Sequence, residues 1–134
     1  MSTLSPTAIA RAWWQAVDRA DFDSAFRLMS PDAVIDWPLS NARMAEPRLW
    51  QQVNEHYPGR WAASVQSLVA DGDSVVTLTD ISDGSINVVA ISFFTVHNGQ
   101  ITNLVEYWPE PYAPPEARSQ WTVPIATCLS QARK

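Results

Sequence analysis

The chain has few of the residues on which several classes of protein depend. Its 134 residues include one cysteine, Cys128, and two histidines, so an internal disulfide is excluded and no metal-ligand spacing occurs. Only four glycines are present, and no GxGxxG or P-loop pattern is formed. No apolar run approaches the roughly 18 residues of a membrane span. We therefore expect no metal ion, no cofactor and no membrane insertion.

Positive charge is also scarce. Nine Lys and Arg against fourteen Asp and Glu give a net charge of −5, which argues against binding to nucleic acid or anionic lipid. The first 14 residues lack the basic start and continuous apolar stretch of a secretory signal, and a lone cysteine suits a reducing compartment. We therefore expect a cytoplasmic protein.

Apolar residues, by contrast, are abundant. They make up 46% of the chain and include seven tryptophans, which excludes disorder, and the length suits one domain. We expect a single domain over residues 1–134, with residues 109–134 as a proline-rich C-terminal extension. Pro109–Pro115 cannot continue a sheet, so it is predicted to run extended across the surface. It would serve there either as a lid over a pocket or as a cover for the sheet.

The first half of the chain shows helical spacing of apolar residues between capping residues and breakers. Ser5 before Pro6 has the pattern of an N-cap with proline at the first helical position. The elements expected here are a helix over Pro6–Arg19, a shorter helix capped by Asp21 and ended before Pro31, a strand at Ala33–Trp37, and a helix from Pro47 to just before Pro58.

The second half has the pattern of strands separated by tight turns. Asp71-Gly72, Asp83-Gly84 and Asn98-Gly99 are turn dipeptides, and turns this short join antiparallel neighbours. The order of elements predicts an α+β fold, with three N-terminal helices packed on a curved, mainly antiparallel sheet. The four strands expected are Ala62–Ala70, Ser74–Ser82, Ile86–His97 and Gln100–Trp108.

The register of the last hairpin decides which residues face the helices. Asn98-Gly99 favours a two-residue turn, which pairs His97 with Gln100. Regular pairing from there predicts one face made of Val89, Ile91, Phe93, Leu104, Glu106 and Trp108. The other face would hold Val88, Ala90, Phe94, Val96, Ile101 and Val105. Both faces are apolar, and the three helices can cover only one of them. We therefore expect the second face to form a homodimer interface. The alternative is that the C-terminal tail covers this second face.

Three segments resemble a known family. They are Asp36–Ser40 (DWPLS), Asn54–Gly59 (NEHYPG) and Gly99–Tyr112 (GQITNLVEYWPEPY), and with the order of elements they resemble the nuclear transport factor 2-like (NTF2-like) superfamily, in particular its SnoaL-like members. The resemblance implies a cone-shaped barrel with an apolar pocket closed by the helices and a convex face that commonly dimerises. It does not fix the function, because this fold supports isomerases, dehydratases, epoxide hydrolases, cyclases and binding modules.

The residues of the best-known enzymes of the superfamily do not carry over. Trp37, Trp13 and Ile91 stand near the three positions that ketosteroid isomerases fill with a basic Asp, a Tyr and a protonated Asp. Polyketide cyclases of the SnoaL type often have an Asp after the Trp of the last strand, and this chain has Pro109 there. The resemblance therefore implies a different set of catalytic groups, or none.

Glu106 is the first candidate for catalysis. On a face with Leu104 and Trp108 its carboxyl would be costly to ionise, so its pKa should rise and it could act as general acid or base. The alternative is a structural ion pair with Arg43 or Arg118. Asp36 is the second candidate, because an inward-facing Asp36 would form a carboxylate pair with Glu106; strand alternation favours the opposite, an ordinary solvated position.

Other groups are weaker candidates. His56 stands near a helix end, where most histidines are solvated, and His97 precedes a turn and is expected to be exposed. The tryptophans are too many for an ordinary core, so some are expected to line a cavity. The ligand-binding residues we expect are Trp13, Trp37, Trp50, Ile91, Phe93, Leu104 and Trp108.

The sequence thus predicts a protein that binds a small apolar molecule. As an enzyme it would be an isomerase, dehydratase or hydrolase, with Glu106 as acid or base and Asp36 or Tyr107 assisting. The alternatives are a binding module in which Glu106 anchors the ligand, and a dimeric association module with a vestigial pocket.

Overall fold

The computed structural model describes residues 4–125, so Cys128 lies outside the described part of the chain. The helices are α1 (Pro6–Asp18), α2 (Phe22–Arg27) and α3 (Pro47–His56). The strands are β1 (Met29–Trp37), β2 (Ala42–Met44), β3 (Ala62–Asp71), β4 (Ser74–Ser82), β5 (Asn87–His97) and β6 (Gln100–Tyr107), with two short 3₁₀ segments, η1 (Pro38–Ser40) and η2 (Glu116–Trp121). None of the described helices is long and apolar enough to cross a membrane.

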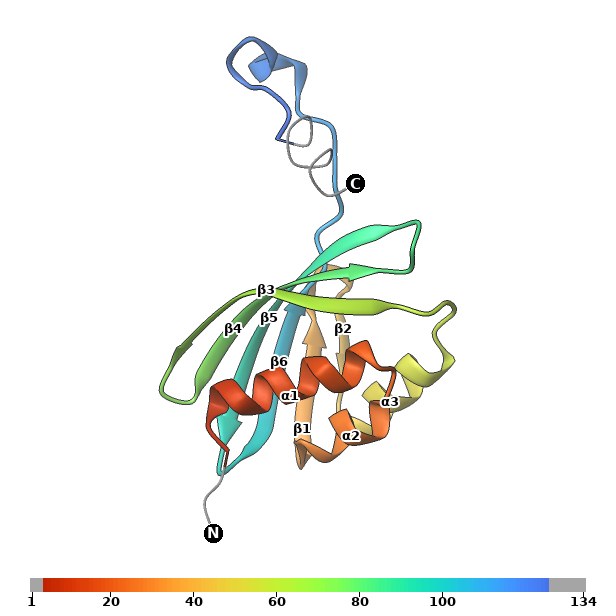
Figure 1. Ribbon diagram of the computed structural model, residues 1–134, viewed down its shortest axis with the longest axis vertical. Coiled ribbons are helices and arrows are strands. Elements are labelled where there is room, and N and C mark those ends of the chain that lie inside the picture. Colours follow the sequence, from red (N-terminus) through yellow and green to blue (C-terminus); the bar gives the residue numbers. More distant parts are fainter. Residues whose placement is uncertain (1–3, 126–134) are drawn as a thin grey trace.

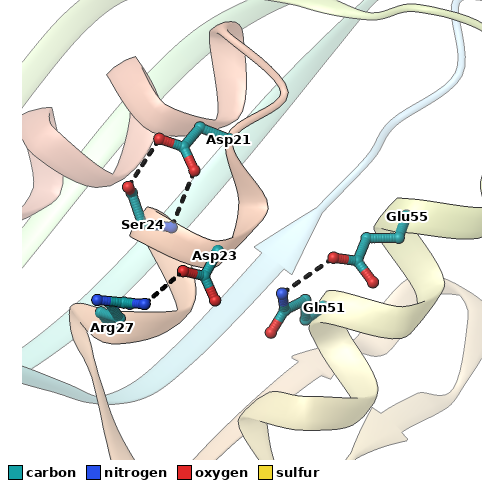
Figure 2. A network of polar contacts seen from close by, with 6 residues as sticks. All are labelled: Asp21, Asp23, Ser24, Arg27, Gln51 and Glu55. Carbon is teal, nitrogen blue, oxygen red and sulfur yellow. Dashed lines mark hydrogen bonds and ion pairs between the residues drawn. The ribbon is translucent and has the colours of Figure 1, made fainter.

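The helices begin where their capping residues predict. The Ser5 hydroxyl accepts a hydrogen bond from the Ala8 backbone N–H at 3.1 Å, and Pro6 takes the first helical position. Asp21 accepts from both the backbone N–H and the hydroxyl of Ser24, at 3.1 and 2.7 Å (Figure 2). These local contacts fix where the chain turns, and so bring the apolar sides of the helices onto the sheet.

The six strands form one curved, unclosed sheet with the order β2-β1-β6-β5-β4-β3. All neighbours are antiparallel except β1 and β6, which run parallel. The helices lie on one side of this sheet (Figure 1). The predicted α+β class, with three helices on a curved and mainly antiparallel sheet, is confirmed. Strand β2 and the parallel pairing of β1 with β6 were not predicted.

The predicted register of the last hairpin is correct at the turn and wrong beyond it. His97 pairs with Gln100, and Asn98 and Gly99 both have positive φ, as a two-residue hairpin turn requires. Thr102 is then an extra residue, a β-bulge, so that Thr95 pairs with Asn103 instead of with Thr102. The bulge shifts every later pair by one residue.

This shift exchanges the two faces of β5. Ser92, not Ile91, pairs with Glu106, and Phe94 pairs with Leu104. Ile91 and Phe93, expected beside Glu106, lie on the outer face of the sheet, where Phe93 is 44% exposed. The homodimer interface predicted on the second face is wrong for the same reason. Of the residues expected there, only Val105 lies on the outer face of the sheet. The others face the helices and pack in or against the core, namely Val88, Ala90, Phe94, Val96 and Ile101.

The segment after β6 neither covers the sheet nor closes over it. Residues 109–125 extend away from the body of the domain (Figure 1), and every residue of this segment is exposed. Neither the lid nor the sheet cover predicted for Pro109–Pro115 is therefore formed. We call residues 109–125 the C-terminal arm.

Candidate functional site

Glu106 lies on the concave side of the sheet, beneath the helices. It is 1% exposed, and it shares a row across three strands with Ser92 of β5 and Thr77 of β4. Burial raises the pKa of Glu106 to about 7, although hydrogen bonds from Ser92 and Trp37 act in the opposite direction. The predicted rise of this pKa is confirmed in direction and in its main cause.

Both carboxyl oxygens of Glu106 accept a hydrogen bond. The Trp37 indole Nε1–H donates to Oε1 at 3.0 Å, and the Ser92 hydroxyl donates to Oε2 at 2.7 Å. An indole can only donate, whereas a hydroxyl can donate or accept. Oε1 is therefore held as an acceptor in either protonation state, and a proton on Oε2 can be accommodated because Ser92 can turn and accept it.

No cation neutralises this carboxyl among the described residues. Arg43, one of its two expected partners, instead donates to both oxygens of Asp36, at 2.6 and 2.9 Å. Arg118, the other, lies in the exposed η2. Glu106 is therefore a buried acid without a counter-ion.

Asp36 does not join Glu106. It pairs with Val105 across β1 and β6, which places it on the outer face of the sheet, and the Arg43 guanidinium lowers the pKa of its carboxyl. Tyr107, expected to assist Glu106, also lies on the outer face, where its ring contacts that of Phe93 at a centroid distance of 6.0 Å. The carboxylate pair is not formed, and Glu106 is the only buried acid among residues 4–125.

The interior around Glu106 is lined by aromatic rings from helices and strands. Trp13 of α1 contacts Trp50 of α3 at a ring distance of 5.2 Å and Phe94 of β5 at 5.4 Å. Trp37 and Trp108 form an edge-to-face pair at 6.1 Å, and both are partly exposed. Trp13, Trp50 and Leu104 are buried in the core, and Trp37 and Trp108 pack against it; that these residues bind a ligand stays a prediction.

Three buried polar atoms of the described chain have no hydrogen-bond partner. They are the indole Nε1 atoms of Trp13 and Trp108 and the hydroxyl of Thr79. Trp14, by contrast, donates from Nε1 to the Thr77 hydroxyl at 3.0 Å. Unpartnered buried donors are costly to the folded protein and are rare, so these three atoms mark places that a ligand or water would stabilise.

Neither of two grooves on the described part of the chain is lined by Glu106. One, of about 420 Å³, runs between Phe26, Met29 and Pro47; the other, of about 220 Å³, lies between Trp14 and Val65. The open apolar pocket expected around Glu106 is therefore not one of these grooves. The histidines are exposed, as expected: the His56 ring donates from Nδ1 to the Gln52 carbonyl at 2.8 Å, and His97 faces Asp73.

Sequence reasoning missed Ser92, Thr77 and Thr79. They are buried polar residues of a largely apolar inner face: Ser92 pairs with Glu106, Thr77 pairs with Ser92, and Thr79 pairs with Ala90. In β4, strand alternation places Val75, Thr77 and Thr79 on one face, so an inward-facing Val75 would have predicted that both threonines face inward too. In β5 both faces are apolar, so only the bulge could have revealed which one faces inward.

The comparison with protein families agrees with this geometry. A family model described as the SnoaL-like domain matches residues 10–104. The chain belongs to the SnoaL-like domain family. The match covers every element from α1 to the middle of β6, and so includes Trp37 and Ser92 but ends just before Glu106. Among curated proteins, none matches this sequence.

Solved structures share the fold of this SnoaL-like domain. A proposed ketosteroid isomerase from Kribbella flavida has a TM-score of 0.84 at 25% identity, covering 90% of this chain and 89% of that one. An NTF2-like protein of unknown function from Burkholderia xenovorans has a TM-score of 0.77 at 28% identity, covering 90% and 94%. An LEH-like epoxide hydrolase of M. tuberculosis, at 22% identity, has a TM-score of 0.65 and covers 78% and 82%, which shows a shared fold alone.

Proposed function

We propose that this SnoaL-like domain binds a small, uncharged and largely apolar molecule between its helices and sheet, where Glu106 acts as general acid or base. The observation that carries this is a fully buried carboxyl that has no counter-ion among the described residues and whose pKa is raised by burial to about 7. General acid–base catalysis is most efficient when the pKa of the group is close to the working pH. A carboxyl kept for structure alone would be expected to have a cationic partner.

The free polar atoms of the interior suggest the class of molecule. Two of them, on Trp13 and Trp108, are indole N–H groups, which only donate, so they suit a ligand with a carbonyl, ether, epoxide or hydroxyl oxygen. None of the buried residues in the described part of the chain is Lys, Arg or His, so these residues would leave an anionic ligand without compensation. Isomerisation, dehydration and hydrolysis of such molecules all require a proton to be moved. The name of the Kribbella protein, a proposed ketosteroid isomerase, supports a proton-transfer reaction of this kind.

Access to Glu106 would pass Trp37 and Trp108. Their rings are partly exposed, whereas the carboxyl hydrogen-bonded to Trp37 is buried. A turn of either ring about its side-chain bonds would uncover the acid without moving a strand. We expect the ligand to enter between Trp37 and Trp108 and to replace part of the contact between their two rings.

Two alternatives remain open. In a non-catalytic binding module, Glu106 would anchor the ligand by a hydrogen bond; in an association module, the interior would have no ligand. Assembly and location complete the proposal: the protein works in the cytoplasm as a homodimer. Its interface would be formed by the outer face of the sheet rather than by the face first expected, because that face is buried beneath the helices.

Proton exchange between D₂O and simple ketones tests the catalytic proposal. The purified protein is incubated with cyclic ketones, and loss of the α-proton signals is followed by NMR; ring opening of small epoxides in ¹⁸O-water is followed in parallel. We expect one of these reactions to be accelerated, and Glu106→Gln to abolish it while ligand binding persists. Binding of these probes without any acceleration would favour the binding module, and no binding at all would favour the association module.

A further inference from the structure

The C-terminal arm carries large apolar side chains that its own domain does not bury. Tyr112, Trp121, Val123 and Ile125 are each at least 73% exposed. The hydrogen bonds of η2 and its surroundings, from Arg118 N–H to Pro115 and from Thr122 to Arg118, join arm residues to one another. Leaving four such side chains in water is unfavourable, so the arm has the composition of a segment that packs against another surface.

A second apolar surface of the same chain is also without a partner. Strands β4, β5 and β6 present it on the side of the sheet opposite the helices (Figure 1). Leu78 and Phe93, near its centre, are 40% and 44% exposed. We call this surface the outer apolar face; it consists of Val76, Leu78, Ile91, Phe93, Val105 and Tyr107.

The arm is built to reach away from its own domain. Four of the seven residues 109–115 are prolines, and Pro115 has φ −58° and ψ 142°, close to polyproline II. At about 3.1 Å per residue these seven residues span roughly 22 Å. Proline also limits the free arm to extended conformations, which reduces the entropy lost when it docks.

We propose that the C-terminal arm of each chain packs on the outer apolar face of a second copy, so that two copies hold each other by exchanging arms. This inference rests on the homodimer of the proposed function and adds the segment that holds it together. A second copy is the occupant because one chain carries both surfaces, and a twofold axis lets each copy give and receive an arm. The proline-rich segment then connects the two domains rather than covering its own.

The dissociation constant of the dimer, measured by analytical ultracentrifugation of the full chain, tests this proposal. Trp121→Ser changes a side chain that is 74% exposed, so the melting temperature of a dissociated monomer should not change. We expect this variant to weaken the dimer about thirtyfold or more, as for loss of a buried tryptophan anchor. Leu39→Ser is the matched control, because Leu39 is also an exposed apolar residue but lies in η1, outside both surfaces.

Phe93→Ser on the outer apolar face distinguishes a failure of the arm proposal from a failure of the homodimer proposal. We expect it to raise the dissociation constant of the dimer as well. In the double variant, Trp121→Ser with Phe93→Ser, the rise should be smaller than the product of the two single rises, because both substitutions remove the same contact. If Phe93→Ser dissociates the dimer and Trp121→Ser does not, the dimer stands and the arm proposal is overturned. If the effects of Trp121→Ser and Phe93→Ser multiply independently, docking of the arm on the outer apolar face is overturned. A wild-type chain that is monomeric at every concentration would overturn both the homodimer proposal and the arm proposal.

Discussion

The indole of Trp37 donates a 3.0 Å hydrogen bond to Glu106, a residue 69 positions later in the chain. The contact exists because β1 runs parallel to β6 in a register that pairs Ile35 with Leu104, which sets the next inward residues side by side. Trp37 is thus the donor to the only buried acid of the described chain, and its partly exposed ring forms an edge-to-face pair with that of Trp108. One of the two hydrogen bonds to the Glu106 carboxyl therefore depends on the Trp37 side chain, and the other on Ser92.

Trp13 and Trp14 form a matched pair for testing the unpartnered donors. Both indoles are buried, but only Trp14 has a hydrogen-bond partner, the Thr77 hydroxyl. Replacing either by Phe removes a similar volume, but Trp14→Phe also leaves Thr77 without its donor. We expect Trp14→Phe to lower the free energy of unfolding by about 1–3 kcal/mol more than Trp13→Phe, measured by urea denaturation. Equal losses of unfolding free energy in the two variants would show that Trp13 Nε1 has a partner in solution. Ligand binding should be weakened only in Trp13→Phe.

The two residues that hold Glu106 differ in how far the sequence could predict them. The helix caps, the Asn98-Gly99 turn and the four later strands follow from local patterns, because caps and turns are decided by contacts within a few residues. Ser92 does not follow, since the bulge at Thr102 shifts the pairing and β5 is apolar on both faces. Glu106 itself was predicted because a carboxyl between Leu104 and Trp108 is unusual whichever residue it faces. Trp37 was predicted as a wall of the pocket, but its bond to Glu106 needed the parallel pairing, which no short-range pattern reveals.

Ser92→Ala should raise the pKa of Glu106 further. The hydroxyl stabilises the charged carboxylate, so its loss leaves burial less opposed. The pKa can be followed by the ¹³C carboxyl shift of Glu106, identified through the signal that disappears in Glu106→Gln. Ser74→Ala in the neighbouring strand β4, at an exposed position, is the control and should leave this pKa unchanged. A fall of the pKa in Ser92→Ala would contradict the hydrogen-bond arrangement described above.

Asp36→Asn should affect stability but not the chemistry of the interior. The Arg43 guanidinium lowers the pKa of the Asp36 carboxyl below 3.8, so this pair stabilises the fold above that pH and the contribution is lost as the pH falls through the lowered pKa. Asp36→Asn should therefore be slightly less stable than the wild type at pH 7 and equal to it at strongly acid pH. The loss is expected to be small because both side chains are partly exposed to solvent. Thermal melts at the two pH values check the stability; loss of the proton-exchange activity in this variant would restore Asp36 as a catalytic candidate.

Glu106→Gln should remove a pH dependence that the wild type has. The folded pKa of about 7 lies above the unfolded value of 4.5, so between these pH values the folded state retains a proton that the unfolded state releases. The wild type should therefore lose stability as the pH rises through this window, by about 3 kcal/mol in all, and lose no more above it.

The glutamine of that variant does not titrate, and it can keep both hydrogen bonds. Its carbonyl oxygen can accept from Trp37 and its amide can donate to the hydroxyl of Ser92. The two proteins should therefore be about equally stable near pH 4, and the variant should be the more stable one at pH 8. Glu55→Gln, at an exposed site on α3, is the control and should follow the wild-type profile. Should Glu106→Gln instead be less stable at pH 8, the carboxylate must have a favourable partner in solution, and the case for a neutralised, proton-transferring Glu106 would fail.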